Sequence, residues 1–185
     1  MSVADAKSTQ GSPFWRFSLR FYRQPRVADA CIALQEESGV DVNLLLFLLW
    51  QATRKRAFAA ADVQELEGRI GGWRDMTVIP LRTLRRALKS PPPLIAGATA
   101  ELFRTKVKAV ELEAERLQQE AMYRLADESP LGREMSSPEE AARASVAAYE
   151  AICGGTFLKP AIQTLLAALA ASSAQRRNDN GQGSA

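Results

Sequence analysis

Histidine is absent from all 185 residues, and cysteine occurs only twice. Histidine is the usual general base near neutral pH and a common ligand of zinc and haem. Its absence excludes Ser-His-Asp and Cys-His catalysis, Cys₂His₂ zinc sites and His-ligated haem. Cys31 and Cys153 form no C-x-x-C motif and are too few for a four-thiolate site. From the sequence we therefore assign no catalytic residue, no metal site and no cofactor.

Long apolar runs are also missing. The longest, residues 44–50, is far shorter than the roughly 20 residues that a membrane-spanning helix needs. The first ten residues are polar and contain no apolar core of a secretion signal. We therefore expect a cytoplasmic protein without a transmembrane segment.

What the chain does contain is typical of helices. Apolar residues make up 46% of it, enough for a core that needs no disulfide or metal. Helix-start signals and helical periodicity recur along the chain and predict an all-α fold, a single-domain bundle of about seven helices. The predicted organisation is a disordered leader (1–11), a helical core domain (12–128), an additional C-terminal helical pair (129–173) and a disordered tail (174–185).

The apolar run Leu44–Trp50 predicts the central helix of the bundle. Leucine outnumbers β-branched residues in this run, which favours helix over strand. A helix that is apolar on every side belongs inside a bundle. Asp41 is placed to cap its start, and Ser12 before Pro13 is placed to cap the first helix.

A long helix is predicted over residues 94–126, after a break at three consecutive prolines. Apolar residues recur in it at alternating steps of four and three, the heptad pattern of a coiled coil. The residues of this seam are Phe103, Val107, Val110, Ala114, Leu117 and Ala121. Such a seam serves either dimerisation or packing within one chain. The small Ala114 and Ala121 favour a hairpin within one chain, and the sequence leaves the oligomeric state open.

Three ordered blocks of sequence carry a family resemblance. They read FWRFSLRFY, CIALQEESGVDVNLLLFLLW and WRDMTVIPLRTLRRALK. Over residues 14–125 the chain resembles an uncharacterised family of small proteobacterial proteins, a domain-of-unknown-function family marked by the patterns F-W-x-F-S-L, D-V-N-L-L-L and P-L-R-x-x-R-R. The resemblance implies an all-helical fold and a bacterial origin, and it implies no activity, cofactor or catalytic residue.

A basic stripe follows Pro80 and is the first candidate binding surface. Its members lie beside a stripe of leucines on the same helix: Arg82, Arg85, Arg86 and Lys89. Arginines on adjacent helical turns can bind phosphates or carboxylates through paired hydrogen bonds. The alternative is an exposed charged face that pairs with the acidic residues of the long helix, as charged helix faces usually do.

A possible pocket is the second candidate. It consists of polar residues near the apolar centre together with the three tryptophans: Trp15, Gln35, Asn43, Trp50 and Trp73. Buried amides must be hydrogen-bonded. They therefore either hold a neighbouring helix or line a small-molecule site, and the structural role is the favoured one.

The aromatic first helix is the third candidate. With its arginine stripe it fits a membrane-interface or partner-docking helix, whereas simple core packing of the aromatics is the favoured alternative.

The function that the sequence favours is non-catalytic. We expect a cytoplasmic adaptor or regulatory protein that binds a protein partner of unknown identity through the basic stripe. One alternative is a small-molecule binder or enzyme using the pocket near Asn43 and the tryptophans. The other is a weak nucleic-acid binder using the basic stripe, although the net charge of +3 is mild for such a protein.

Overall fold

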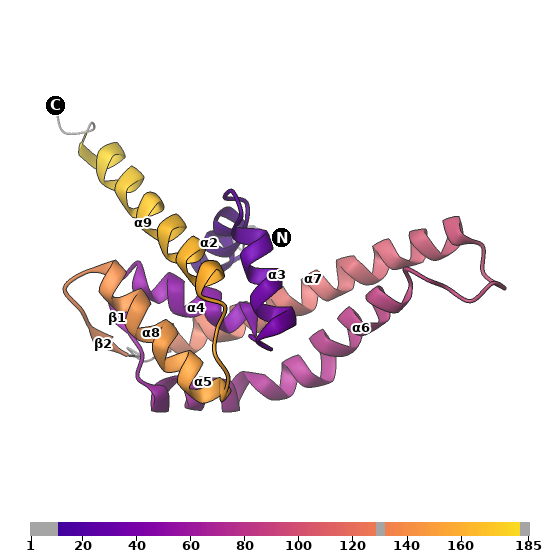
Figure 1. The fold of residues 1–185 in the computed structure, drawn as a ribbon, viewed down its shortest axis with the longest axis horizontal. Helices are drawn as coiled ribbons and strands as arrows, with labels where there is room; N and C mark the ends of the chain where they lie inside the picture. Colours follow the sequence, from indigo (N-terminus) through magenta and orange to yellow (C-terminus); the bar gives the residue numbers. More distant parts are fainter. Residues whose placement is uncertain (1–10, 129–131, 182–185) are drawn as a thin grey trace, which may run out of the picture.

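The computed structural model describes residues 11–128 and 132–181 and confirms the predicted all-α fold (Figure 1). Its helices are α2 (Pro13–Tyr22), α3 (Val27–Glu37), α4 (Val42–Ala52), α5 (Ala60–Trp73), the π-helix η1 (Arg74–Val78), α6 (Ile79–Ala87), α7 (Gly97–Glu128), α8 (Pro138–Cys153) and α9 (Lys159–Gly181). Residues 1–10 of the predicted leader and 182–185 of the predicted tail lie outside the described residues.

The central helix is α4. All of its residues from Asn43 to Ala52 are buried, as expected for a helix that is apolar on every side. The Oδ1 atom of Asp41 accepts hydrogen bonds from the backbone N–H groups of Asn43 (2.8 Å) and Leu44 (3.3 Å). The predicted cap of this helix is therefore confirmed.

The aromatic side of α2 packs against α4. Phe14 stacks on Trp50 with 5.3 Å between ring centroids and meets Phe47 edge-on at 5.4 Å. The predicted start is confirmed, because Ser12 Oγ accepts a hydrogen bond from the Trp15 backbone N–H (3.1 Å). The arginines of α2 are exposed. This helix thus buries its three phenylalanines in the core and presents its arginines to solvent.

Helices α5, η1 and α6 follow one another without a break, and the π-helix ends at Val78, two residues before Pro80. Proline has no backbone N–H, so it cannot continue the regular ladder of a helix. In η1 the Ile79 N–H donates instead to the Arg74 carbonyl, five residues earlier. The chain therefore passes Pro80 as a helix, an outcome that the sequence left open.

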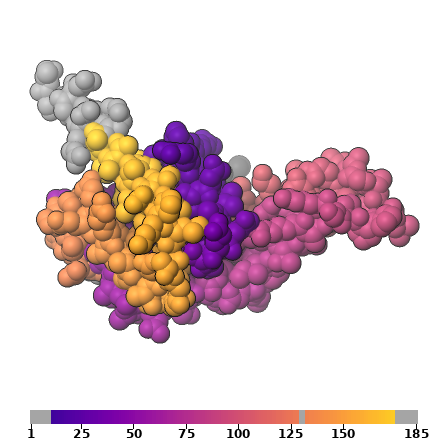
Figure 2. Space-filling view, viewed as in Figure 1, coloured from indigo at the N-terminus to yellow at the C-terminus, as the bar shows by residue number. Residues whose placement is uncertain are grey.

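Helices α6 and α7 lie side by side and project together from the rest of the molecule (Figure 1). The predicted long helix is present, with bounds Gly97–Glu128 in place of 94–126. We call residues 79–117 the arm; they comprise α6, the connection after it and α7 as far as Leu117. The space-filling view shows the outer part of the arm standing clear of the other helices, whereas its base lies against the rest of the molecule (Figure 2).

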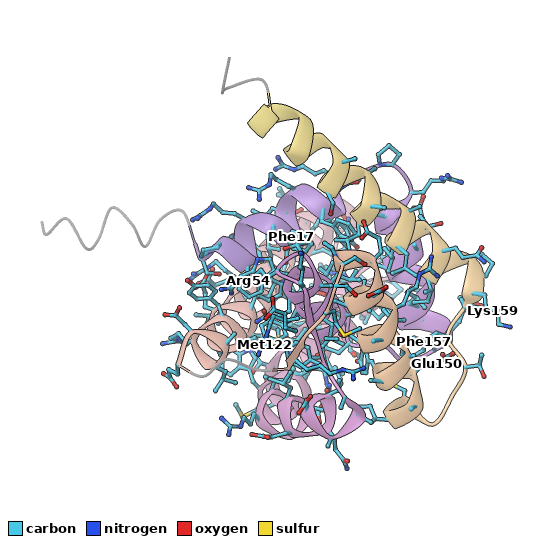
Figure 3. The ribbon with its side chains drawn as sticks, turned by 90° about the vertical axis from the view of Figure 1, so that its left-hand side faces the viewer. Phe17, Arg54, Met122, Glu150, Phe157 and Lys159 are labelled. Carbon is cyan, nitrogen blue, oxygen red and sulfur yellow. The ribbon has the colours of Figure 1, made fainter. Side chains whose placement is uncertain are left out.

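The C-terminal helices join the same buried cluster as α4. Val146 of α8 and Leu165 and Leu169 of α9 all belong to it. At the connection between these helices, the Phe157 backbone N–H donates to Glu150 Oε1 (2.7 Å), and both residues are labelled in Figure 3. The sequence could not say whether this pair covers the bundle, and the packing shows that it does.

Helix α9 continues to Gly181, past the end at residue 173 expected from the sequence. Residues 174–180 include Ala, Gln and Arg, which are good helix formers, and no proline or glycine interrupts them. This segment had been expected to be disordered because of its polarity.

A two-residue β ladder joins the loop after α4 to the segment before α8. It pairs β1 (Arg56–Ala57) with β2 (Arg133–Glu134) in antiparallel fashion. Gly132 has a φ of +69°, and a Cβ atom there would lie 2.5 Å from the Ala57 carbonyl oxygen. Only glycine fits so close an approach in this conformation.

We predict that Ser145→Ala destabilises the fold by about 1–3 kcal/mol. The buried hydroxyl of Ser145 accepts a hydrogen bond from the Phe58 backbone N–H (3.0 Å), and its removal leaves that buried N–H unpaired. Urea unfolding measures the effect. The control is Ser136→Ala, which removes an exposed hydroxyl and should change stability by less than about 0.5 kcal/mol. Equal losses for the two variants would contradict the prediction.

Candidate functional site: the polar cleft and the arm

A buried polar network connects the start of α4 to the middle of α7. The Asn43 side-chain amide donates to Gln118 Oε1 (2.9 Å) and accepts from Gln119 Nε2 (2.7 Å). The Nε2 of Gln118 in turn donates to the second oxygen of Asp41, Oδ2 (2.9 Å). Asp41 therefore caps α4 with one oxygen and holds α7 with the other. Asn43 has the structural role that buried amides usually have.

Tyr149 of α8 ties a third helix to the same point. Its hydroxyl oxygen accepts a hydrogen bond from the Asp41 backbone N–H (2.9 Å). Burial, reinforced by the nearby Asp41 carboxylate, raises the pKa of Tyr149 well above its usual value. The phenol thus stays protonated and is a structural contact rather than a base.

Arg74, the first residue of the π-helix, lies among three carboxylates. Its Nε donates to Asp75 (2.9 Å), and its Nη1 donates to Glu67 and, at 3.5 Å, to Asp41. Burial alone lowers the Arg74 pKa, but the hydrogen bonds to Glu67 and Asp75 outweigh it and raise the pKa. Three negative groups against one positive group leave a local charge of −2. Glu67 Oε2 is buried and has no hydrogen-bond partner among the described residues.

An open cleft of about 870 Å³ lies where the C-terminal ends of α3 and α8 face η1 and α6. Its charged and amide lining includes Gln35, Glu67, Arg74, Asp75, Arg82 and Arg86. π-Helices occur frequently at functional sites, so the cleft is one candidate site. Its size and polar lining suit a small polar molecule.

The predicted pocket residues do not meet around this cleft. Gln35 lines it, whereas Asn43 lies in the buried network. Trp50 lies in the aromatic core, where it also contacts Tyr123 at 5.7 Å. Trp73 Nε1 donates to the Ala114 carbonyl (3.0 Å), and Trp15 is half-buried. The tryptophans therefore pack helices and do not share a cavity with Gln35.

The basic stripe is largely paired within the chain. Arg82 donates to Glu111 (3.1 Å) and Glu115 (2.8 Å), and Arg85 Nη2 donates to Glu111 (3.2 Å). Glu111 is buried. Burial is the largest influence on Glu115 and raises its carboxyl pKa, although Arg82 acts to lower it. The two arginines and two glutamates sum to zero charge between α6 and α7.

The outer half of the stripe remains at the surface. Arg86 pairs with Glu36 of α3 at 2.6 Å, and both side chains are about half exposed. Lys89, just beyond α6, is exposed. The surface that the sequence predicted for binding thus divides into two residues turned toward α7 and two exposed ones.

The heptad seam of α7 is only half covered. Val107 and Ala114 are buried. Phe103, Val110 and Leu117 are 51%, 55% and 40% exposed. The seam therefore packs one row of its residues within the chain, as the hairpin alternative required, and leaves the other row facing solvent. We call Phe103, Val110 and Leu117 the heptad stripe.

More apolar side chains are exposed near the tip of the arm. Leu94 is 92% exposed and Leu102 is 70% exposed, and Ile95 is close to half exposed. We call these three residues the tip patch. Contiguous exposed apolar residues on a soluble protein mark interaction sites or aggregation hazards.

Several residues that organise the site escaped sequence analysis, notably Glu111, Gln118, Arg74 and Tyr149. One signal was available for Glu111 and Gln118. They follow Val107 and Ala114 respectively by four residues, which places two polar side chains on the buried row of the long helix. Nothing comparable marks Arg74 or Tyr149, whose partners are far away in sequence.

The family comparison covers the arm and the polar network. A family model described as a protein of unknown function, DUF2390, matches residues 13–122. The chain belongs to the DUF2390 family. No curated protein and no solved structure matches significantly. The DUF2390 match includes α2 to α6 and α7 up to Met122, and thus both the tip patch and the heptad stripe.

Two features are absent from the described residues of this DUF2390 protein. In residues 11–128 and 132–181, no three His, Cys, Asp or Glu side chains are grouped to hold a metal ion. None of the helices in that part of the chain is both long and apolar enough to cross a membrane.

Glu111→Gln is expected to lower stability by about 1–3 kcal/mol and to loosen the arm. The substitution removes the charge that Arg82 and Arg85 share and places an amide donor against their N–H groups. Hydrogen exchange of the α6 amides and urea unfolding measure the effect. The control is Glu65→Gln, which breaks an exposed pair with Arg69 and should cost less than about 1 kcal/mol. Unchanged exchange in α6 would show that these ion pairs do not hold the arm.

The two cysteines should differ in reactivity. Burial raises the pKa of Cys31 to about 12, and its side chain is fully buried. Cys153 is exposed, although partial burial and Glu67 raise its pKa as well. Because the thiolate is the reacting form, a disulfide reagent should modify one thiol per folded molecule, faster as pH rises, and two after unfolding. Cys153→Ser should abolish the reaction of the folded protein, and equal rates for both thiols would contradict the structure.

Proposed function

We propose that this protein acts by binding another protein through the apolar outer surface of the arm. The observation that carries the proposal is the inverted arrangement of the arm. Ion pairs of Arg82 and Arg85 with Glu111 lie between its two helices, whereas leucines of the tip patch face water. Residues are normally distributed the other way, with leucine inside and charge outside.

The exposed apolar residues are concentrated in one region. Thirteen large apolar side chains are exposed among the described residues, and ten of them lie between Met76 and Leu117. The body of the molecule, in contrast, buries its large apolar residues around α4. Scattered exposed leucines need no explanation, but a concentration on a projecting hairpin does.

The charges of the arm favour a protein partner over a nucleic acid. Binding to phosphates depends on cations that are free to release counterions. Arg82 and Arg85 are neutralised by Glu111 and Glu115, and Arg86 is paired with Glu36. The arginines of the basic stripe are therefore already neutralised, and the exposed cations that they leave for a phosphate backbone are lysines: Lys89, Lys106 and Lys108.

The cleft supports ligand binding less directly. The arginines that line it are Arg74, Arg82 and Arg86, and each already pairs with a carboxylate of the chain. A ligand would have to displace one of these pairs, whereas a partner on the arm would cover surface that is already exposed.

We also propose that the protein is cytoplasmic, bacterial and non-catalytic. The two free cysteines, Cys31 and Cys153, suit a reducing compartment. The bacterial origin rests on the three sequence blocks given above. The absence of histidine supports a role that does not depend on the commonest general base.

The test is affinity capture of the tagged full chain from its own cell lysate at low and high salt, with mass spectrometry of retained proteins. A partner held by the tip patch should stay bound at high salt. The double variant Leu94→Ser, Leu102→Ser should reduce its recovery at least about tenfold, because burying one leucine contributes about 1.5–3 kcal/mol.

The matched control is Leu19→Ser with Ile32→Ser, which removes two exposed apolar residues outside the arm and should leave capture unchanged. A partner that is lost at high salt, or on Arg86→Glu with Lys89→Glu, would instead support the basic stripe. Capture that is indifferent to every one of these changes would contradict the proposal.

A further inference from the structure

The heptad stripe is a regular apolar row that the described residues leave about half exposed. Its members are spaced by seven residues, so they lie on one side of α7 along about 21 Å. They run beside the buried Val107 and Ala114 and are each 40–55% exposed. A strict seven-residue repeat of apolar side chains is the pattern by which one helix packs along another.

We infer that a second copy of this chain covers the heptad stripe, with the two α7 helices antiparallel and the symmetry axis at Val110. The inference deepens the proposed function, on which it rests, by naming one occupant of the outer surface of the arm. In a twofold dimer the same patch faces itself, so each residue and its contact exchange roles between the copies.

The order of side chains in the stripe suits this self-pairing. With the axis at Val110, Val110 meets Val110 of the second copy. Phe103 then meets Leu117 of the second copy, since the two are seven residues from Val110 in opposite directions. The large ring thus faces the branched aliphatic chain twice, and the smallest member lies at the centre.

The flanking charges select the antiparallel orientation. Lys106 and Glu113 are exposed on the same flank of the stripe, before and after Val110. An antiparallel pair places the same flank of both helices on one side of the interface, so Lys106 of each copy lies near Glu113 of the other. A parallel pair places the two flanks on opposite sides of the interface and brings none of these charges together. Glu113 also accepts hydrogen bonds from Arg116 of its own helix at 2.6 Å and 2.8 Å. That exposed pair contributes little and leaves the carboxylate available.

Two heptads make a short contact, because sustained coiled coils use three or four. We therefore expect a reversible dimer whose population rises with concentration. Sedimentation velocity of the full chain from about 1 μM to about 1 mM measures it. The expected result is a monomer at the low end of this concentration range and a dimer at the high end.

Val110→Glu and Val110→Lys should each be monomeric over the whole range, because each sets two like charges against one another at the axis. An equimolar mixture of the two variants should form a dimer again. Leu112→Glu is the matched control. Leu112 is 48% exposed but lies about 200° around α7 from Val110, so this variant should associate like the unaltered protein.

Orientation is tested by exchanging the flanking charges. Lys106→Glu and Glu113→Lys should each weaken the dimer several-fold, and the double variant should restore it. In a parallel dimer the double variant would gain nothing over either single change. Thermal unfolding checks that each variant is folded, which is expected because Lys106, Val110 and Glu113 are exposed.

A monomer at every concentration, or a dimer indifferent to Val110→Glu, would overturn the inference. Its failure is distinguishable from failure of the proposed function. If the protein is a monomer but still captures another protein through Leu94 and Leu102, the inferred dimer is wrong and the proposed function is supported. If the protein dimerises as described but captures no other protein, the dimer is supported and binding of another protein through the tip patch is contradicted.

Discussion

Burial of α4 on all sides is the constraint from which the rest of the architecture follows. A helix with no polar face can be stable in water only when other helices enclose it completely. Helices α2, α7 and α8 do so, and Asp41 fixes where that enclosure begins, because its two oxygens bind α4 and α7 at once. Tyr149 adds α8 to the same junction. These helices together enclose α4. Helix α7, with 32 residues, is much longer than the 11-residue α4 that it covers.

The arm is what remains of α7 beyond that enclosure, together with α6. No large core is available there, and ion pairs centred on the buried Glu111 hold the two helices together. Buried ion pairs of this kind fix the relative position of two helices more than they add to the free energy of unfolding. They can hold α6 against α7 while the apolar residues of the arm remain on its outer surface. The tip patch and the heptad stripe are then exposed to other molecules, whereas the arginines that line the cleft beneath α6 are already paired with carboxylates. An apolar hairpin that projects from the body suits the association that we propose.

Local features of this protein were predictable from its sequence, and long-range pairings were not. Ser12 and Asp41 mark helix starts through contacts within three residues, and the run around Leu44 identifies the central helix by composition alone. The pairing of Arg82 with Glu111 joins residues 29 positions apart, and that of Asn43 with Gln118 joins residues 75 apart. Periodicity alone could not tell which row of the α7 seam would be covered, because both rows are apolar. The π-helix also escaped prediction. A proline such as Pro80 is compatible either with a break in the helix or with a shift of the backbone hydrogen bonds to the π pattern seen here.

The central claim is that the outer surface of the arm is covered when the protein works. Hydroxyl-radical footprinting inside living cells, compared with the dilute purified protein, measures this directly by the oxidation of individual side chains. Met76 and Leu19 are exposed outside the arm and serve as internal references. We expect Leu102, Phe103 and Val110 to be protected several-fold in cells while Met76 and Leu19 are oxidised equally in both samples. Equal oxidation of all five side chains in cells and in dilute solution would contradict the claim.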